Sequence, residues 1–298
     1  MSSFFDGIRE NTNNHESAAG IITSEGVLAL GKERNTRFIA VTSGKGGVGK
    51  TNIVANLSVS LSELGKKVVV LDADFGLANL DVLLGLTPRY HLGHVLYGDK
   101  SLGEIMVQGP EGIKIIPASS GLQQMSELTL MQRNRLIDDF RRLDMDIDYF
   151  IIDTAAGVSR NVVHFLISAG EVFVVSAPEP TSIVDAYAVI KIILAEDSEK
   201  PIRVIVNSVK KEEDAHEVFC QINSVVKRFL KREVDYLGYV ERDNHVQQAV
   251  KSQMLVTNRF PNAPASRCFR NLAQQIVRGE NNTFEGPIWE KLLNDWVN

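Results

Sequence analysis

The feature that most restricts the fold of this chain is a glycine-rich segment that lies between an apolar stretch and a helical pattern. The segment reads Ser43-Gly44-Lys45-Gly46-Gly47-Val48-Gly49-Lys50-Thr51. It has the Gly-x4-Gly-Lys-Thr spacing of a phosphate-binding loop, in which glycines let backbone N–H groups approach phosphate oxygens at a helix N-terminus. In this pattern Lys50 reaches the β- and γ-phosphates and Thr51 offers a hydroxyl to Mg²⁺. We therefore expect a nucleotide site built from Gly44, Gly46, Gly47, Val48, Gly49, Lys50 and Thr51.

The rest of the chain alternates short β-branched runs with longer helical patterns. Strands are predicted at 38–42, 67–71, 113–116, 149–152, 172–176, 202–206 and 236–240. Helices are predicted at 50–64, 130–143, 161–169, 183–195 and 215–230. Strand–helix alternation with doubly apolar strands predicts an α/β fold, a doubly wound and mainly parallel sheet with helices on both faces. Ligands of such sheets bind beyond the carboxyl ends of the strands.

Two further segments place acids at the ends of predicted strands. Asp153 ends one of them and could join the Mg²⁺ shell, while Gly157 could offer its N–H to a γ-phosphate. Asp72 and Asp74 leave another strand, where Asp74 could orient an attacking water and Asp72 could support the metal shell. The alternative is that Asp72 or Asp74 serves as a turn or helix-capping residue.

Composition and charge argue against several classes of protein. The 298 residues are 44% hydrophobic with a net charge of -5, which is unlike a general nucleic-acid binder, so nucleic acid is not an expected partner. The two cysteines, Cys220 and Cys268, are too few for a disulfide scaffold and are interpreted as structural thiols. The start has no secretion signal, which predicts a cytoplasmic protein.

Three regions are expected: a polar arm at 1–36, the phosphate-loop domain at 37–278, and a linker with an amphipathic helix at 279–298. Within 284–297, Ile288, Leu292, Leu293, Trp296 and Val297 would form one apolar stripe. Peripheral membrane contact, docking onto the protein's own core and a partner surface all remain open for this helix. Its acidic charge counts against anionic lipid.

Taken together, these motifs resemble the deviant phosphate-loop ATPases of the MinD/ParA class. The resemblance covers residues 37–276 and rests on the extra Lys45 in the loop, Asp72-Ala73-Asp74 and Asp153-Thr154-Ala155-Ala156-Gly157. Within that class, the segments 76–85, 109–117 and 178–187 are most similar to the flagellar-number regulators, the FlhG or FleN group.

The resemblance implies an ATP-dependent homodimer with slow, Mg²⁺-dependent hydrolysis of ATP. It implies that Lys45 contacts the partner subunit's phosphates, that Glu179 contacts the partner's ribose, and that Asn207 recognises the base. The family's Pro-x-Asp step reads Glu241-Arg242-Asp243 here, which makes Asp243 the matching acid. Flagellar assembly or regulatory proteins are the implied partners, and contact with the inner face of the cell membrane is an open alternative. The alternative function is spatial regulation of cell division or cargo.

Overall fold

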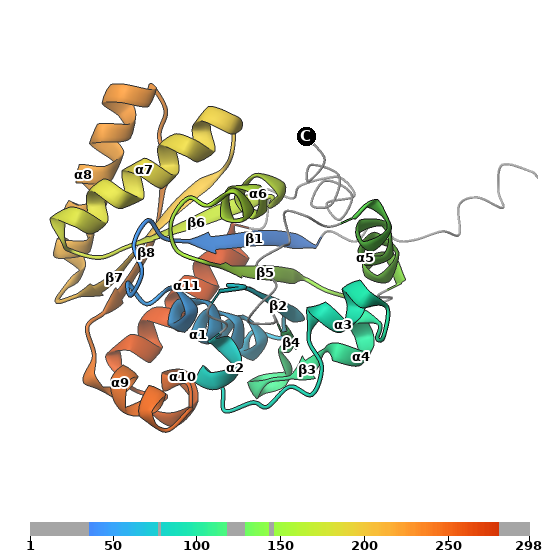
Figure 1. The fold of residues 1–298 in the computed structure, drawn as a ribbon. Coiled ribbons are helices and arrows are strands. Elements are labelled where there is room, and N and C mark those ends of the chain that lie inside the picture. Colours follow the sequence, from blue (N-terminus) through green and yellow to red (C-terminus); the bar gives the residue numbers. More distant parts are fainter. Residues whose placement is uncertain (1–35, 77–78, 118–128, 143–145, 280–298) are drawn as a thin grey trace, which may run out of the picture. The chain divides into compact units, whose positions relative to one another are not determined.

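The computed structural model describes residues 36–76, 79–117, 129–142 and 146–279. Their centre is an eight-stranded sheet in the order β3-β4-β2-β5-β1-β6-β7-β8 (Figure 1). The strands are β1 Arg37–Thr42, β2 Val68–Ala73, β3 Val107–Gln108, β4 Lys114–Ile116, β5 Tyr149–Thr154, β6 Glu171–Ser176, β7 Ile202–Val209 and β8 Asp235–Glu241. Within this sheet only the β3–β4 pair is antiparallel. The expected doubly wound, mainly parallel α/β fold is confirmed.

Helices cover both faces of this sheet. They are α1 Lys50–Glu63, α2 Leu80–Leu83, α3 Leu92–Tyr97, α4 Leu102–Ile105, η1 Pro110–Gly112, α5 Leu130–Arg142, α6 Arg160–Ser168, α7 Pro180–Glu196, α8 Glu212–Leu230, α9 Asn244–Lys251, α10 Val256–Arg259 and α11 Pro264–Arg278. One face carries α1 and α11 and the other carries α6, α7 and α8 (Figure 1).

Strand β1 shows how the sequence pattern builds two cores. Phe38 and Ala40 pack into the hydrophobic cluster beneath α6 and α7, while Ile39 and Val41 pack into the cluster beneath α1 and α11. Successive side chains of a strand point to opposite faces, so a strand covered on both sides needs apolar residues throughout. All six residues of β1 are buried accordingly. The strand is thereby held rigidly where it feeds the phosphate loop.

The seven strands and five helices predicted between residues 38 and 240 are all present, with ends that differ by no more than three residues. The two-residue strand β3 and the helices α2 to α4, η1 and α9 to α11 were not predicted. Residues 1–35 and 280–298 lie outside the described residues, and so does the predicted tail helix at 284–297. Among the helices that the structure describes, none combines the length and apolarity needed to cross a membrane.

Candidate functional site

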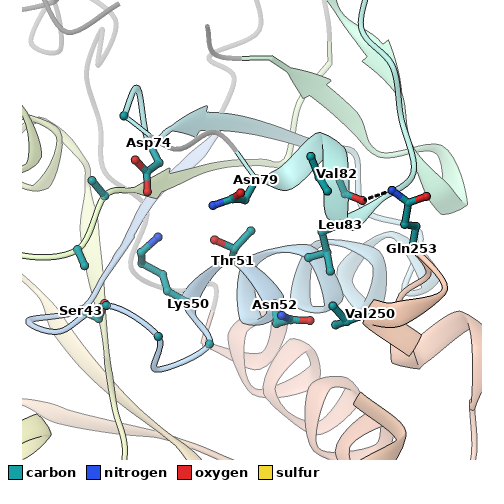
Figure 2. Close-up of a pocket in the computed structure, with 16 residues that line it drawn as sticks. Ser43, Lys50, Thr51, Asn52, Asp74, Asn79, Val82, Leu83, Val250 and Gln253 are labelled. Carbon is teal, nitrogen blue, oxygen red and sulfur yellow. Dashed lines mark hydrogen bonds between the residues drawn. The ribbon is translucent and has the colours of Figure 1, made fainter. Parts of the chain in front are cut away.

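A cavity of about 730 Å³ opens at the carboxyl ends of the central strands (Figure 2). The loop after β1 forms one wall through Ser43, Lys50 and Thr51, and Asp74 lies across from it after β2. Because β1, β2 and β5 are parallel neighbours, their carboxyl ends meet at one edge of the sheet. The predicted phosphate loop and Asp74 therefore line one cavity, while Asp72 and Asp153 lie buried at the same edge of the sheet.

Lys50 and Asp153 form an ion pair at the floor of this site. The Nζ atom of Lys50 lies 2.6 Å from Oδ1 of Asp153, and their side chains are only 8% and 1% exposed. Burial raises the pKa of the Asp153 carboxyl, while the Lys50 ammonium and the Thr51 hydroxyl act in the opposite direction. The sequence prediction that Lys50, Thr51 and Asp153 belong to one site agrees with this geometry.

Glycines of the loop fall into two kinds. A Cβ at Gly44 would lie 2.3 Å from the carbonyl oxygen of Asp185 on α7, and one at Gly49 would lie 2.4 Å from Nδ2 of Asn207. Gly44 is required because the backbone of α7 fills the space, and Gly49 is required chiefly because its φ of +90° is unfavourable for other residues. A Cβ at Gly46 or Gly47 would meet nothing within 4 Å. Those two positions leave their N–H groups open to a ligand.

Asp72 is buried and its carboxylate is occupied by backbone groups. Its Oδ1 accepts from the N–H of Asp74 at 3.1 Å, and its Oδ2 accepts from the N–H of Leu80 at 3.3 Å. Burial, together with the nearby Asp153 carboxylate, raises the pKa of Asp72 to about 7. Asp72 thus makes backbone contacts of the kind that the turn interpretation expects, and its support of the metal shell stays a prediction. Asp74 is half-buried and lines the cavity.

Lys45 and Glu179 meet outside the cavity. The Nζ atom of Lys45 lies 3.0 Å from Oε2 of Glu179, and the two side chains are 45% and 59% exposed. Gly157 is also engaged within the chain, because its N–H donates to the carbonyl oxygen of Ser43 at 2.9 Å. An approach of the Gly157 N–H to a phosphate would require that this hydrogen bond be exchanged.

Asn207 lies against the loop, where its Nδ2 donates to the carbonyl oxygen of Val48 at 2.7 Å. Asp243 is used differently, since it caps α9 by accepting from the N–H of His245 at 2.9 Å and accepts from the N–H of Ala265 at 3.2 Å. Burial alone would raise the pKa of Asp243, but the His245 and Ala265 donors outweigh it and lower that pKa. Asn207 is thus beside the predicted site, whereas the Asp243 oxygens are occupied at the starts of two helices.

Comparison with known proteins identifies the family. A family model described as an AAA domain matches residues 36–205. The antiactivator FleN of Pseudomonas aeruginosa is 42% identical, over 83% of this chain and 88% of FleN. The flagellum site-determining protein YlxH of Helicobacter pylori is 35% identical over 82% of each chain. The MinC:MinD cell division complex of Aquifex aeolicus is similar in structure, with a TM-score of 0.67 and 27% identity over 82% of this chain and 96% of that one. This chain belongs to the MinD/ParA family of P-loop ATPases.

The described part of the site has oxygen donors but no complete metal cage. Among the described residues, no group of three His, Cys, Asp or Glu side chains could hold a metal. Mg²⁺ is commonly bound through one or two protein oxygens together with nucleotide phosphates. The Thr51 hydroxyl and the Asp153 carboxylate of this MinD/ParA ATPase are donors of the type that Mg²⁺ prefers.

The sequence analysis missed the far side of the cavity. Val82 and Leu83 of α2, with Val250 of α9 and Gln253 just beyond it, line this wall together with Asn79 (Figure 2). Nothing local in the sequence marks Val250 or Gln253 as site residues. They join the site only because the chain after β8 folds back onto α1 and α2.

Proposed function

We propose that this chain is an ATP-dependent dimerisation switch that hydrolyses ATP slowly and regulates flagellar number or placement. The observation that carries the proposal is the different placement of the two loop lysines. Lys50 lies buried at the floor of the cavity, paired with Asp153, whereas Lys45 is exposed outside it. One lysine can therefore serve the phosphates bound by its own chain while the other is presented to a second subunit.

In the proposed reaction, the loop N–H groups and Lys50 bind the ATP phosphates. Mg²⁺, when bound with ATP, neutralises charge on the β- and γ-oxygens. Thr51 and Asp153 are placed to hold the ion, and Asp72 supports this region from behind. Asp74 lines the same cavity and is the group we assign to orienting the attacking water. Catalysis of this kind depends on positioning and electrostatics more than on covalent chemistry.

Dimerisation supplies the proposed switch. For Lys45 to reach the partner subunit's phosphates, its ion pair with Glu179 must open. Both side chains are well exposed, and such surface pairs contribute only about 0–1 kcal/mol. Opening this pair therefore costs little, and it frees Glu179 for the partner's ribose. Asn207 is the group that we assign to the base.

The flagellar role rests on similarity to FleN and YlxH. Spatial regulation of cell division or cargo is the second candidate, favoured by the structural similarity to the MinC:MinD complex. The tail at 284–297 stays a candidate for peripheral membrane contact, for docking on the core or for a partner surface. Flagellar assembly or regulatory proteins are the partners that we propose.

The switch is tested by measuring molar mass with light scattering after gel filtration. Asp74→Ala protein in saturating Mg-ATP should double its mass from 33.0 kDa, and the same protein in Mg-ADP should remain monomeric. Lys45→Ala introduced into the Asp74→Ala background should remain monomeric in Mg-ATP but still bind ADP. A monomer mass for Asp74→Ala protein in Mg-ATP would rule out the dimerisation switch.

The biological role is tested by electron microscopy of cells that lack the gene, scoring flagella per cell and the positions of septa. Extra or misplaced flagella with normal septa would support the flagellar role. Minicells or filaments with normal flagella would support the division role instead.

A further inference from the structure

Gln253 connects the turn after α9 to the helix that follows the Asp72–Asp74 step. Its Nε2 donates to the backbone carbonyl of Val82 in α2 at 3.2 Å, and both residues line the candidate nucleotide cavity (Figure 2). The two residues are 171 positions apart in the sequence. This hydrogen bond therefore joins the C-terminal part of the sheet domain to the segment that carries Asp74.

The Gln253 side of this contact is firmly attached to the phosphate-loop helix. Thr257, four residues further on, donates through its N–H and its hydroxyl to Oδ1 of Asn56, at 3.2 and 3.1 Å. Asn56 is fully buried in α1, the helix that begins with Lys50. Movement of the Gln253 turn relative to the loop would break these buried hydrogen bonds, which is costly.

The α2 side is short and is held at both ends. The N–H of Leu80, its first residue, donates to Asp72. Gly85, just beyond the helix, has a φ of +64°, and a Cβ there would lie 3.4 Å from both Cβ and the carbonyl oxygen of Gln253. A four-residue helix has little stability of its own. Its position therefore depends on contacts with the rest of the domain: the burial of Leu80 and Leu83 in the core, the Asp72 contact at one end and the Gln253 contact at the other.

The backbone of Gln253 closes the C-terminal end of α9. Its φ is +52°, a left-handed conformation that is unfavourable for a residue with a side chain. Glycine would adopt this conformation at lower cost. The turn carries a glutamine here, and the side chain makes the contact to α2. Helices commonly end in this conformation, and here the N–H groups of Gln253 and Met254 donate to the Val250 and Ala249 carbonyl oxygens at 2.9 and 3.1 Å.

We propose that Gln253 is a positioning residue for ATP hydrolysis, acting as a latch that holds α2 beside the phosphate loop. The effect reaches Asp74 through the Asp72 carboxylate, which accepts from the N–H of Leu80 in α2 and from the N–H of Asp74. The inference rests on the ATPase activity proposed above. Loss of the latch leaves the phosphate loop intact, because that loop is held by β1 and α1. It loosens the segment that carries Asp74, so the rate of hydrolysis falls while nucleotide affinity is retained.

The test compares Gln253→Glu with Gln247→Glu. Gln253→Glu keeps the size and shape of the side chain but replaces the donor with a carboxylate that repels the Val82 carbonyl. Gln247 is an exposed residue of α9, so Gln247→Glu changes the charge equally and leaves the latch in place. The mobility of α2 is measured as the hydrogen-exchange rate of two backbone amides, those of Leu83 and Leu84, in protein without nucleotide. These amides donate to the carbonyl oxygens of Asn79 and Leu80.

We expect Gln253→Glu to speed exchange at these amides at least fivefold and to lower kcat at least threefold, with the Kd for Mg-ADP within twofold of wild type. Gln247→Glu should match wild type in all three. Gln253→Gly suits the left-handed backbone conformation but also removes the side-chain donor. It should therefore show the same faster exchange and lower kcat as Gln253→Glu. Unchanged exchange in Gln253→Glu would overturn the latch, and faster exchange with unchanged kcat would overturn its positioning role.

The failure of this inference can be told from failure of the proposed function. If the wild-type protein binds Mg-ADP but shows no ATP hydrolysis, the proposed activity fails and the positioning role fails with it. The exchange measurement would still report whether the latch holds α2. If wild-type protein hydrolyses ATP and Gln253→Glu is indistinguishable from it, only the present inference fails.

Discussion

At the residue scale, the buried pair of Lys50 and Asp153 combines a stabilising role with a functional one. The pair is almost wholly removed from water, with Nζ and Oδ1 2.6 Å apart. Removing one partner of a buried ion pair leaves an uncompensated charge, which costs far more than the pair itself contributes. Substitution of the loop lysine therefore affects folding as well as phosphate binding.

We expect Lys50→Ala to lower the free energy of unfolding by about 3–5 kcal/mol in the absence of nucleotide, because Asp153 is left buried without its cation. The Lys50→Met/Asp153→Asn double variant removes both charges and should recover most of this loss. Urea denaturation at pH 7.5 measures the free energy of unfolding of the wild type, of Lys50→Ala and of the double variant. A Lys50→Ala protein as stable as wild type would show that Asp153 finds another partner.

At the element scale, α7 packs directly onto the phosphate loop. The start of α7 is held by Ser182, whose hydroxyl accepts from the N–H of Ala177 at 2.9 Å. One turn later, the backbone of Asp185 fills the space where a Cβ at Gly44 would lie. The helix that follows Glu179 and the loop that carries Lys45 are therefore in direct contact. If either element moves when the proposed dimer forms, the other must move with it or lose this packing contact.

Gly44→Ala should destabilise the protein by about 1–3 kcal/mol, because an added methyl group must displace the backbone of α7. Gly46→Ala is the matched control, since a Cβ there meets nothing within 4 Å. It should leave the Tm unchanged without nucleotide while weakening Mg-ATP binding. Thermal unfolding and nucleotide titration of both variants test this. Equal Tm losses in the two variants would contradict the packing argument.

At the scale of the whole molecule, both hydrophobic clusters are built from residues between Phe38 and Ile276. The parallel strands, the phosphate loop and the cavity all lie within this part of the chain. A core of this size can support a cooperative fold by itself.

We expect a variant consisting of residues 36–279 to unfold cooperatively and to bind Mg-ADP within twofold of the full chain, because the loop and its supports are retained. Any binding to anionic vesicles that depends on the 284–297 stripe should be lost. Circular dichroism, nucleotide titration and vesicle sedimentation provide the measurements. Aggregation of the variant, or loss of ADP binding, would show that the terminal segments belong to the ATPase domain.

Much of the architecture could be predicted from the sequence because its signals are local. Apolar runs on both faces indicated buried parallel strands, and the loop from Gly44 to Thr51 carried its chemistry in adjacent residues. Strand β3 was not predicted because it has only two residues, which are too few to show an alternating pattern. Helix α11 was not predicted, although Pro264 is its first residue and its apolar residues follow helical spacing.

The sequence by itself determined the fold class, the phosphate loop and the acids at the strand ends. Only the tertiary structure decided which groups meet: Asp153 with Lys50, 103 positions away, and Gln253 with Val82. It also showed that the Asp243 carboxylate caps helices, a role that its motif position did not indicate. The physical reason is that local patterns encode backbone conformation and the buried face. Contacts between distant side chains depend on strand order and register, which arise only when the whole sheet assembles.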